Sequence, residues 1–192
     1  MKYYKIILKY VKYNPLVWID PLLYNDLGWG DYDLQKCKYI KDWDKRNTVF
    51  FKDFEIAEDR TTITLPAPCI SQKLKDILEN DLQIKWVQYL PIRFQHKTKS
   101  DYTIDWYYVL NILNLLDEAV IDKEKSMPDW LGTYFNIVFF EDKIDCDIFR
   151  IKTYEVAFFI SERFKKAIYP ITKSYLAFRE VKYRALNFKP HE

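Results

Sequence analysis

The stretch Ile70-Ser-Gln-Lys-Leu-Lys-Asp-Ile-Leu78 has a close counterpart later in the chain, Ile160-Ser-Glu-Arg-Phe-Lys-Lys-Ala-Ile168. In both stretches a serine stands where an N-cap is expected, because its hydroxyl can accept a free backbone N–H of the first helical turn. Apolar residues then recur at helical spacing, which predicts two amphipathic helices. An aromatic-rich segment follows each helix, Trp86–Tyr89 and Tyr175–Phe178. We interpret the pair as a βαβ-like unit used twice.

Runs of aromatic, β-branched and alternating residues predict short strands around these helices. The N-terminal strand is expected to be half-buried, with Tyr4 and Ile6 on its apolar face. In the strand 83–94, Ile84 and Trp86 are expected to share one face with Gln88. The fold class that follows is α+β, with a mixed, largely antiparallel sheet of short strands and a few short amphipathic helices. The predicted strands are 1–12, 48–51, 61–65, 83–94, 106–112, 134–140, 148–151, 155–160 and 175–181, with 113–121 open to either helix or strand.

The length of the chain, 192 residues, predicts a single domain that buries a core without disulfides or metal. Pro66-Ala-Pro68 divides it into two possible lobes, a β- and turn-rich part (1–66) and a second part (67–192). Residues 13–47 are turn-rich and hold several tryptophans, so they are not expected to be disordered.

The cysteines and the N-terminus indicate the compartment. Cys37, Cys69 and Cys146 are odd in number and widely spaced, which favours a reducing environment. The N-terminal run is interrupted by Lys9 and Lys12, so it does not fit a signal peptide. No apolar run reaches the length of a bilayer. We therefore expect a cytoplasmic protein that does not insert into a membrane.

Catalytic and cofactor motifs are missing from the sequence. Only three glycines occur, and neither GxGxxG nor GxxxxGK[ST] can be formed, so a phosphate-cradling loop is not expected. The two histidines, His96 and His191, are not clustered with other metal-ligating residues, and no cofactor or metal is expected. Asp117 and Glu118 follow a long apolar run, and an acid there either caps a helix or pairs with a buried arginine. They also define the alternative function, an enzyme or small-ligand-binding protein with a carboxylate pocket.

Charge is balanced overall but not along the chain. Residues 1–52 carry 10 basic and 6 acidic side chains, residues 53–160 carry 12 and 19, and residues 161–192 carry 8 and 3. The acidic middle argues against a nucleic-acid partner and favours a basic protein surface.

The order of several short motifs resembles a known family. These motifs are Leu65–Ser71, Trp86–Ile92, Tyr107–Ile112, Leu116-Asp117, Lys125-Ser126, Ile148–Arg150 and Phe158–Phe164. Over about residues 60–181 this order resembles an immunity-protein family of bacterial polymorphic toxin systems, the eleventh such family, formerly a domain of unknown function. Members of that family often carry a glycine shortly before the last aromatic strand, and the matching stretch 171–178 has none.

The resemblance implies a non-catalytic protein that binds and neutralises a cognate toxin domain in the cytosol. Such a role needs aromatic anchors on a rigid scaffold. The residues predicted to contact the partner are Trp29 and Trp43 in the turn-rich segment 13–47, and Asp129 and Trp130 in the segment 127–132.

Overall fold

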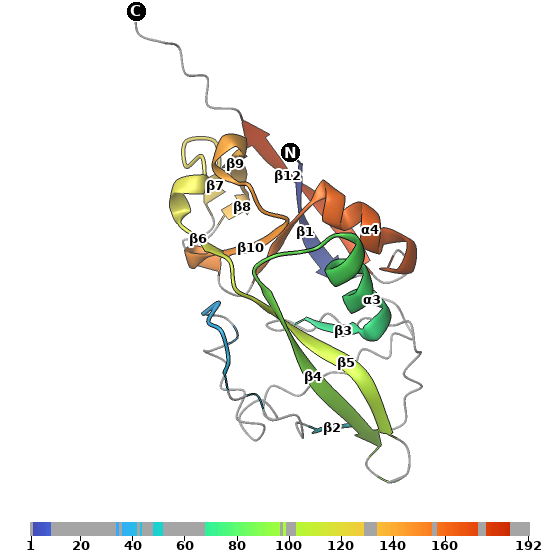
Figure 1. Ribbon diagram of the computed structural model, residues 1–192. Coiled ribbons are helices and arrows are strands. Elements are labelled where there is room, and N and C mark those ends of the chain that lie inside the picture. Colours follow the sequence, from blue (N-terminus) through green and yellow to red (C-terminus); the bar gives the residue numbers. More distant parts are fainter. Residues whose placement is uncertain are drawn as a thin grey trace, which may run out of the picture.

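A computed structural model gives the fold of the chain (Figure 1). It describes residues 2–8, 34, 36–41, 43, 48–51, 68–96, 98, 103–128, 134–154, 157–172 and 176–184. The strands are β1 (Tyr3–Leu8), β2 (Thr48–Phe51), β3 (Cys69–Ser71), β4 (Val87–His96), β5 (Thr103–Ile112), β6 (Leu115–Leu116), β7 (Met127–Pro128), β8 (Tyr134–Asn136), β9 (Val138–Phe140), β10 (Ile148–Ile151), β11 (Phe159–Ser161) and β12 (Leu176–Arg184). The helical elements are α3 (Gln72–Asp76), the π-helical turn η1 (Ile77–Asp81), the 3-10 turns η2 (Glu118–Val120), η3 (Glu141–Lys143) and η4 (Lys152–Tyr154), and α4 (Glu162–Thr172).

The strands form a six-stranded sheet (β6-β10-β11-β1-β12-β9), a four-stranded sheet (β2-β4-β5-β3) and a two-stranded one (β7-β8). Within the described ranges, six strand pairings are antiparallel and three are parallel. The predicted α+β class, with a mixed, largely antiparallel sheet of short strands, is confirmed.

The two predicted helix–strand units are present and share their local geometry. Ser71 Oγ accepts a hydrogen bond from Leu74 N at 3.4 Å, and Ser161 Oγ accepts one from Phe164 N at 3.1 Å. Each serine ends a three-residue buried strand and caps the helix that follows. The buried helical positions also correspond: Leu74 and Leu78 in the first unit, Phe164 and Ile168 in the second.

In each unit the two strands flank a third, antiparallel strand. This third strand is β5 in the first unit and β1 in the second, and the two lie far apart in the sequence. β5 pairs antiparallel with β3 and β4, and β1 pairs antiparallel with β11 and β12. The register corresponds as well, because Tyr108 lies opposite Ile70 and Tyr4 lies opposite Ile160. The first strand of the chain thus completes the C-terminal unit, so the segments 1–66 and 67–192 are interleaved in the sheets.

Two apolar clusters lie on opposite faces of β1. On one face Tyr4 joins the buried residues of α3 and α4, which lie side by side in Figure 1. On the other face Tyr3 packs against Phe139 and Phe149 with its ring edge-on, and its hydroxyl donates to Ile144 O at 2.9 Å. The expectation of a half-buried first strand holds only in part, because Tyr3, on the face opposite to Tyr4, is fully buried, whereas Lys5 on the same face as Tyr3 is half-buried.

Several element boundaries also differ from expectation. β4 begins at Val87, because Gln83 and Trp86 have left-handed backbones that no regular strand contains. Residues 113–121 form the short β6 and η2 in place of a long helix or strand. β11 covers only Phe159–Ser161, and α4 continues to Thr172 with Pro170 in its last turn. Within the described ranges, no helix has both the length and the apolar character to cross a membrane.

Candidate partner-binding surface

Three residues other than glycine have positive φ in the part of the chain that the structure describes. They are Cys37 (φ 54°), Gln83 (φ 51°) and Trp86 (φ 62°). A left-handed backbone costs such residues about 1–2 kcal/mol each, because Cβ approaches the following carbonyl oxygen. Residues held in this way concentrate at binding and active sites. The two segments that contain them, 36–41 and 83–88, are in direct contact.

Side-chain amides hold these two segments together. Gln88 Oε1 accepts from Ile40 N at 3.1 Å, and Gln88 Nε2 donates to Ile40 O at 2.7 Å. The buried Asn111 donates from Nδ2 to Lys38 O at 2.9 Å and to Gln88 Oε1 at 3.1 Å. Segment 36–41 is therefore fixed on the β4–β5 sheet by bonds that replace those of a neighbouring strand. Such buried amide networks rigidify the backbone they hold.

A π-helical turn places Gln83 and Trp86. The first unit has one residue more than the second between its cap serine and its matching strand aromatic, Ser71 to Tyr89 against Ser161 to Phe178. A π-turn accommodates one additional residue, and Leu82 N donates to Ile77 O at 3.0 Å across it. Ile84 N then donates to Leu78 O at 2.9 Å, which anchors the connection to the core. The left-handed Trp86 follows directly before β4.

Two large aromatic side chains project from this frame into solvent. The exposed fraction is 66% for Tyr39 and 65% for Trp86, although tryptophan is highly buried on average. The backbone of Trp86 is nevertheless fixed, because its carbonyl accepts from Leu113 N at 2.8 Å. We call the residues 36–41 and 83–86 the Tyr39/Trp86 surface. Its exposed cations include Lys38, Lys41 and Lys85.

The structure describes only one of the partner-binding residues predicted from the sequence. Trp43 is half-buried, and its Nε1 donates to Pro91 O at 2.7 Å, so it fastens residue 43 to β4 close to the Tyr39/Trp86 surface. Trp29, Asp129 and Trp130 lie outside the described residues. Trp86 was assigned to a regular strand, which hid its exposure.

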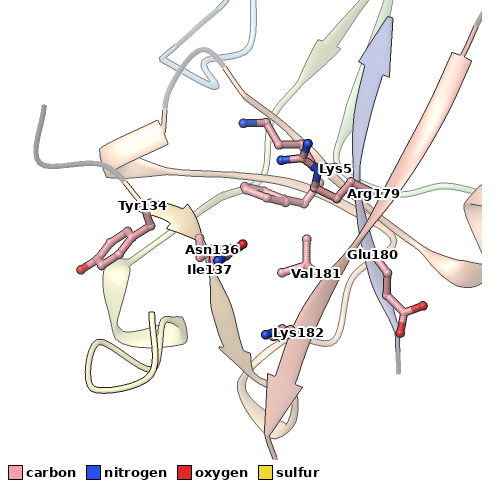
Figure 2. A pocket seen from close by; sticks show the side chains of 9 residues that line it. Lys5, Tyr134, Asn136, Ile137, Arg179, Glu180, Val181 and Lys182 are labelled. Atoms are coloured by element: carbon pink, nitrogen blue, oxygen red, sulfur yellow. The ribbon is translucent and has the colours of Figure 1, made fainter. Parts of the chain in front are cut away.

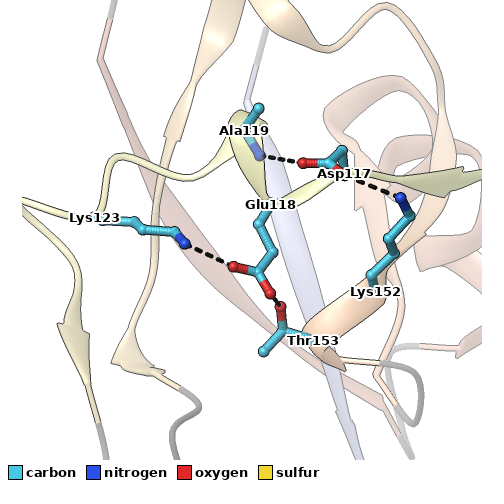
Figure 3. Close-up of polar contacts among 6 residues, drawn as sticks. All are labelled: Asp117, Glu118, Ala119, Lys123, Lys152 and Thr153. Carbon is cyan, nitrogen blue, oxygen red and sulfur yellow. Dashed lines mark hydrogen bonds and ion pairs between the residues drawn. The ribbon is translucent and has the colours of Figure 1, made fainter.

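Asp117 and Glu118 belong to a surface ion-pair network (Figure 3). Asp117 Oδ1 accepts from Ala119 N at 3.1 Å and thereby caps η2, and its Oδ2 lies 3.0 Å from Lys152 Nζ. Glu118 Oε2 lies 2.7 Å from Lys123 Nζ, and Glu118 also bonds the hydroxyl of Thr153. The predicted helix cap is confirmed, but the cationic partner is an exposed lysine.

This network keeps both acids ionised. The hydrogen bond from Lys152 lowers the pKa of Asp117, and the hydrogen bond from Lys123 lowers the pKa of Glu118. A general acid needs the opposite shift, toward neutral pH, which burial or a neighbouring carboxylate would provide. The arrangement favours a structural role, in which the two acids tie η2 to the residues that follow β10.

Thiols and metal ligands do not form a reactive cluster in the described ranges. Cys37, Cys69 and Cys146 are not in disulfide bonds. Burial raises the pKa of Cys146 to about 12, so this thiol stays protonated at neutral pH. Among the described residues, no group of three or more His, Cys, Asp or Glu side chains could hold a metal ion.

No protein-family model matches the chain, and no curated protein matches it in sequence.

Proposed function

We propose that this chain is an immunity protein that binds a cognate bacterial toxin domain in the cytosol and neutralises it without catalysis. The observation that carries the proposal is Trp86, an exposed tryptophan held in a left-handed backbone by a rigid frame. Both its exposure and its backbone are unfavourable for the free protein. A partner that buries the indole accounts for its exposure, because tryptophan and tyrosine are among the residues most enriched in interface hot spots. Strained backbones of this kind concentrate at binding sites, which agrees with the same position.

The surroundings of Trp86 define the chemistry of the partner. Lys38, Lys41 and Lys85 are exposed around the two aromatics and favour an acidic partner surface. This is opposite in sign to the partner expected from the acidic middle of the sequence. Complementary charge at the rim of an interface accelerates association and fixes orientation. A single-stranded nucleic acid would use the same residue types, and the experiment below separates the two.

The toxin-neutralising part of the proposal is supported by the resemblance over about residues 60–181. That span supplies β3, α3, β4 and β5, which form the rigid frame behind Trp86. Pre-organised frames bind tightly because little conformational entropy is lost on association.

The proposal predicts a toxin domain encoded upstream of this gene, and co-expression with that domain tests it. Wild-type protein should restore growth, Trp86→Ala should not, and Tyr169→Ala should restore growth like wild type. Tyr169 is a matched control, because it is also an exposed aromatic, at 48%, but lies on α4. Folded wild-type protein that fails to protect, or that binds single-stranded nucleic acid in place of the toxin, would contradict the proposal.

A further inference from the structure

The first helix–strand unit contains a lysine that is surrounded by two aromatic rings and a carboxylate. Lys75 Nζ lies 5.3 Å from the ring centroid of Tyr89 and 5.4 Å from that of Tyr108. The same ammonium group pairs with Glu79, one helical turn further along the chain. The rings and the carboxylate together supply the negative charge that a partly buried ammonium group needs.

The second unit contains the corresponding lysine and rings, but an aromatic residue stands in place of the carboxylate. Lys165 Nζ lies 3.7 Å from the ring centroid of Tyr4 and 5.9 Å from that of Phe178. Tyr169 occupies the position of Glu79, and its ring centroid lies 6.1 Å from that of Phe178. Lys165 is half-buried, and no carboxylate of the described residues forms an ion pair with it.

The acidic residues in the surroundings of α4 pair with other cations. Glu162 on the same helix pairs with Lys166 at 3.4 Å. Glu180 lies opposite Tyr4 in the β1–β12 pair, but it pairs with Lys2 at 2.9 Å. In Figure 2 the side chain of Glu180 points away from the other residues of the groove that it lines. Neither carboxylate takes the role that Glu79 has in the first unit.

The neighbouring helical elements α3 and η1 carry exposed carboxylates without a cationic partner. α4 is in contact with η1, and α3 and α4 lie side by side in Figure 1. Asp76 and Asp81 are exposed, and neither forms an ion pair within the described ranges. Asp76 accepts a hydrogen bond from the neutral amide of Gln72 at 2.7 Å. The helix pair therefore has an unpaired cation on one helix and unpaired carboxylates on the other.

A surface divided in this way is complementary to itself. A twofold axis that runs between the two helices and along them places α4 of one copy against α3 and η1 of a second copy. The reciprocal contact forms at the same time, which is the isologous arrangement of homodimers. A different acidic protein could engage Lys165 but would leave Asp76 and Asp81 without cationic partners. Charge complementarity therefore favours a second copy of this chain.

We propose that α3, η1 and α4 form a self-association surface, on which Lys165 of one copy binds Asp76 or Asp81 of a second copy. Tyr169, which is 48% exposed, gains an apolar contact across the interface. Two short helices offer a small interface, and small interfaces belong to weak, transient complexes. The surface shares no residue with the Tyr39/Trp86 surface, so its existence does not depend on the proposed neutralisation of a toxin.

Sedimentation equilibrium of the full chain, at concentrations up to about 1 mM so that weak dimers are populated, tests the proposal. We expect a reversible monomer–dimer equilibrium that weakens as salt is added. Lys165→Gln should weaken association about tenfold or more, and so should Asp76→Asn/Asp81→Asn, because each removes both charge contacts of the dimer. Lys152→Gln is the matched control and should associate like wild type, because this exposed lysine of η4 pairs with Asp117.

A mixture of the two variants tests the twofold arrangement. The Lys165→Gln copy keeps its carboxylates and the Asp76→Asn/Asp81→Asn copy keeps its lysine, so one of the two contacts re-forms in a mixed dimer. The mixture should therefore associate more tightly than either variant alone.

Four results would overturn the proposal: wild-type protein that stays monomeric, variants that associate like wild type, a mixture no tighter than its components, or equal weakening by Lys152→Gln. Titration of monomeric wild-type protein with a tetraglutamate peptide, followed by NMR, identifies the alternative occupant. Saturable shifts at the amides of Lys165 and Tyr169 would then assign the surface to another acidic protein and exclude a second copy.

Discussion

The two helix–strand units have matching interiors and different surfaces. In both, a serine ends a buried strand, caps a helix and precedes two buried helical positions. A lysine at the same helical position lies over two rings in each unit: Lys75 over Tyr89 and Tyr108, and Lys165 over Tyr4 and Phe178. The second unit continues as a regular helix to Thr172, whereas the first continues as a π-turn. Two left-handed residues, Gln83 and Trp86, follow the π-turn in the first unit.

This difference separates what holds the fold from what we propose binds the partner. The shared features lie in the common core between α3 and α4, where packing decides which residues fit. The first unit has its π-turn and its left-handed Trp86 at the exposed end, between the helix and β4. Tyr175, the counterpart of Trp86 in the second unit, lies outside the described residues. We propose that the two repeats keep the same interior and that the first binds its partner at the connection between helix and strand.

The largest expected effect is the loss of stability on truncating a core side chain, and it tests whether the two units contribute equally to the shared core. Leu78→Ala and Ile168→Ala each remove a fully buried side chain from one shared cluster. Each should lower the free energy of unfolding by about 2–5 kcal/mol, from lost burial and the remaining cavity. Urea denaturation measures both, with the exposed Lys166→Ala as control. A loss for one variant that is less than half of the other would break the equivalence.

Both cap serines should stabilise the fold, but replacing Ser161 should cost more free energy of unfolding than replacing Ser71. Ser71→Ala should cost about 1 kcal/mol, because one N–H of the first turn loses its acceptor. Ser161→Ala should cost about 2 kcal/mol, because Ser161 Oγ also donates to Asp147 Oδ1 at 2.5 Å. Thermal unfolding checks the order, and Thr at either position should recover most of the loss. A greater loss at Ser71 would contradict this account of the second cap.

The ion pair at the second cap gives a smaller, pH-dependent difference. Burial alone would raise the pKa of Asp147, but hydrogen bonds from Arg163 and Ser161 outweigh it and lower the pKa. The stabilisation is therefore present at pH values above the carboxyl's unfolded pKa and is lost as pH falls through its folded pKa. Arg163→Gln should cost up to about 1 kcal/mol at pH 7, since Arg163 is largely exposed. Urea midpoints from pH 7 to pH 3 should converge with those of wild type, and a gap that widens in acid would exclude the pair as its source.

The sequence was sufficient to predict the repeated unit and the fold class. Serine caps, helical spacing and short aromatic strands act locally, and these signals located both helices and β10 at Ile148–Ile151. The role of β1 was not predictable in this way, because its partners β11 and β12 lie at the other end of the chain. The alternation of apolar and polar residues in β1 is the same for a half-buried strand at the edge of a sheet and for a central strand.

The candidate site was less predictable than the fold. The run Lys85-Trp-Val-Gln-Tyr89 has strand-forming composition, and nothing in this composition predicts the left-handed backbone of Trp86 or the π-turn before it. Comparison of the two repeats shows that the first has one residue more, and this was the one available signal. The position of Tyr39 depends on the side-chain amides of Gln88 and Asn111, which bond the neighbouring residues Ile40 and Lys38 and are distant in sequence. The net charge of sequence segments did not predict the charge of this surface for the same reason. Lysines from the basic segment 1–52 and from the acidic segment 53–160 lie together on it.

Trp86→Gly tests the central claim most directly, because glycine tolerates the left-handed backbone and has no indole. We predict that its free energy of unfolding equals that of wild type or exceeds it by up to about 1 kcal/mol, while its affinity for the toxin domain falls by about 2 kcal/mol or more, roughly 30-fold. An unchanged affinity together with a less stable fold would show that Trp86 serves the structure and would contradict the claim.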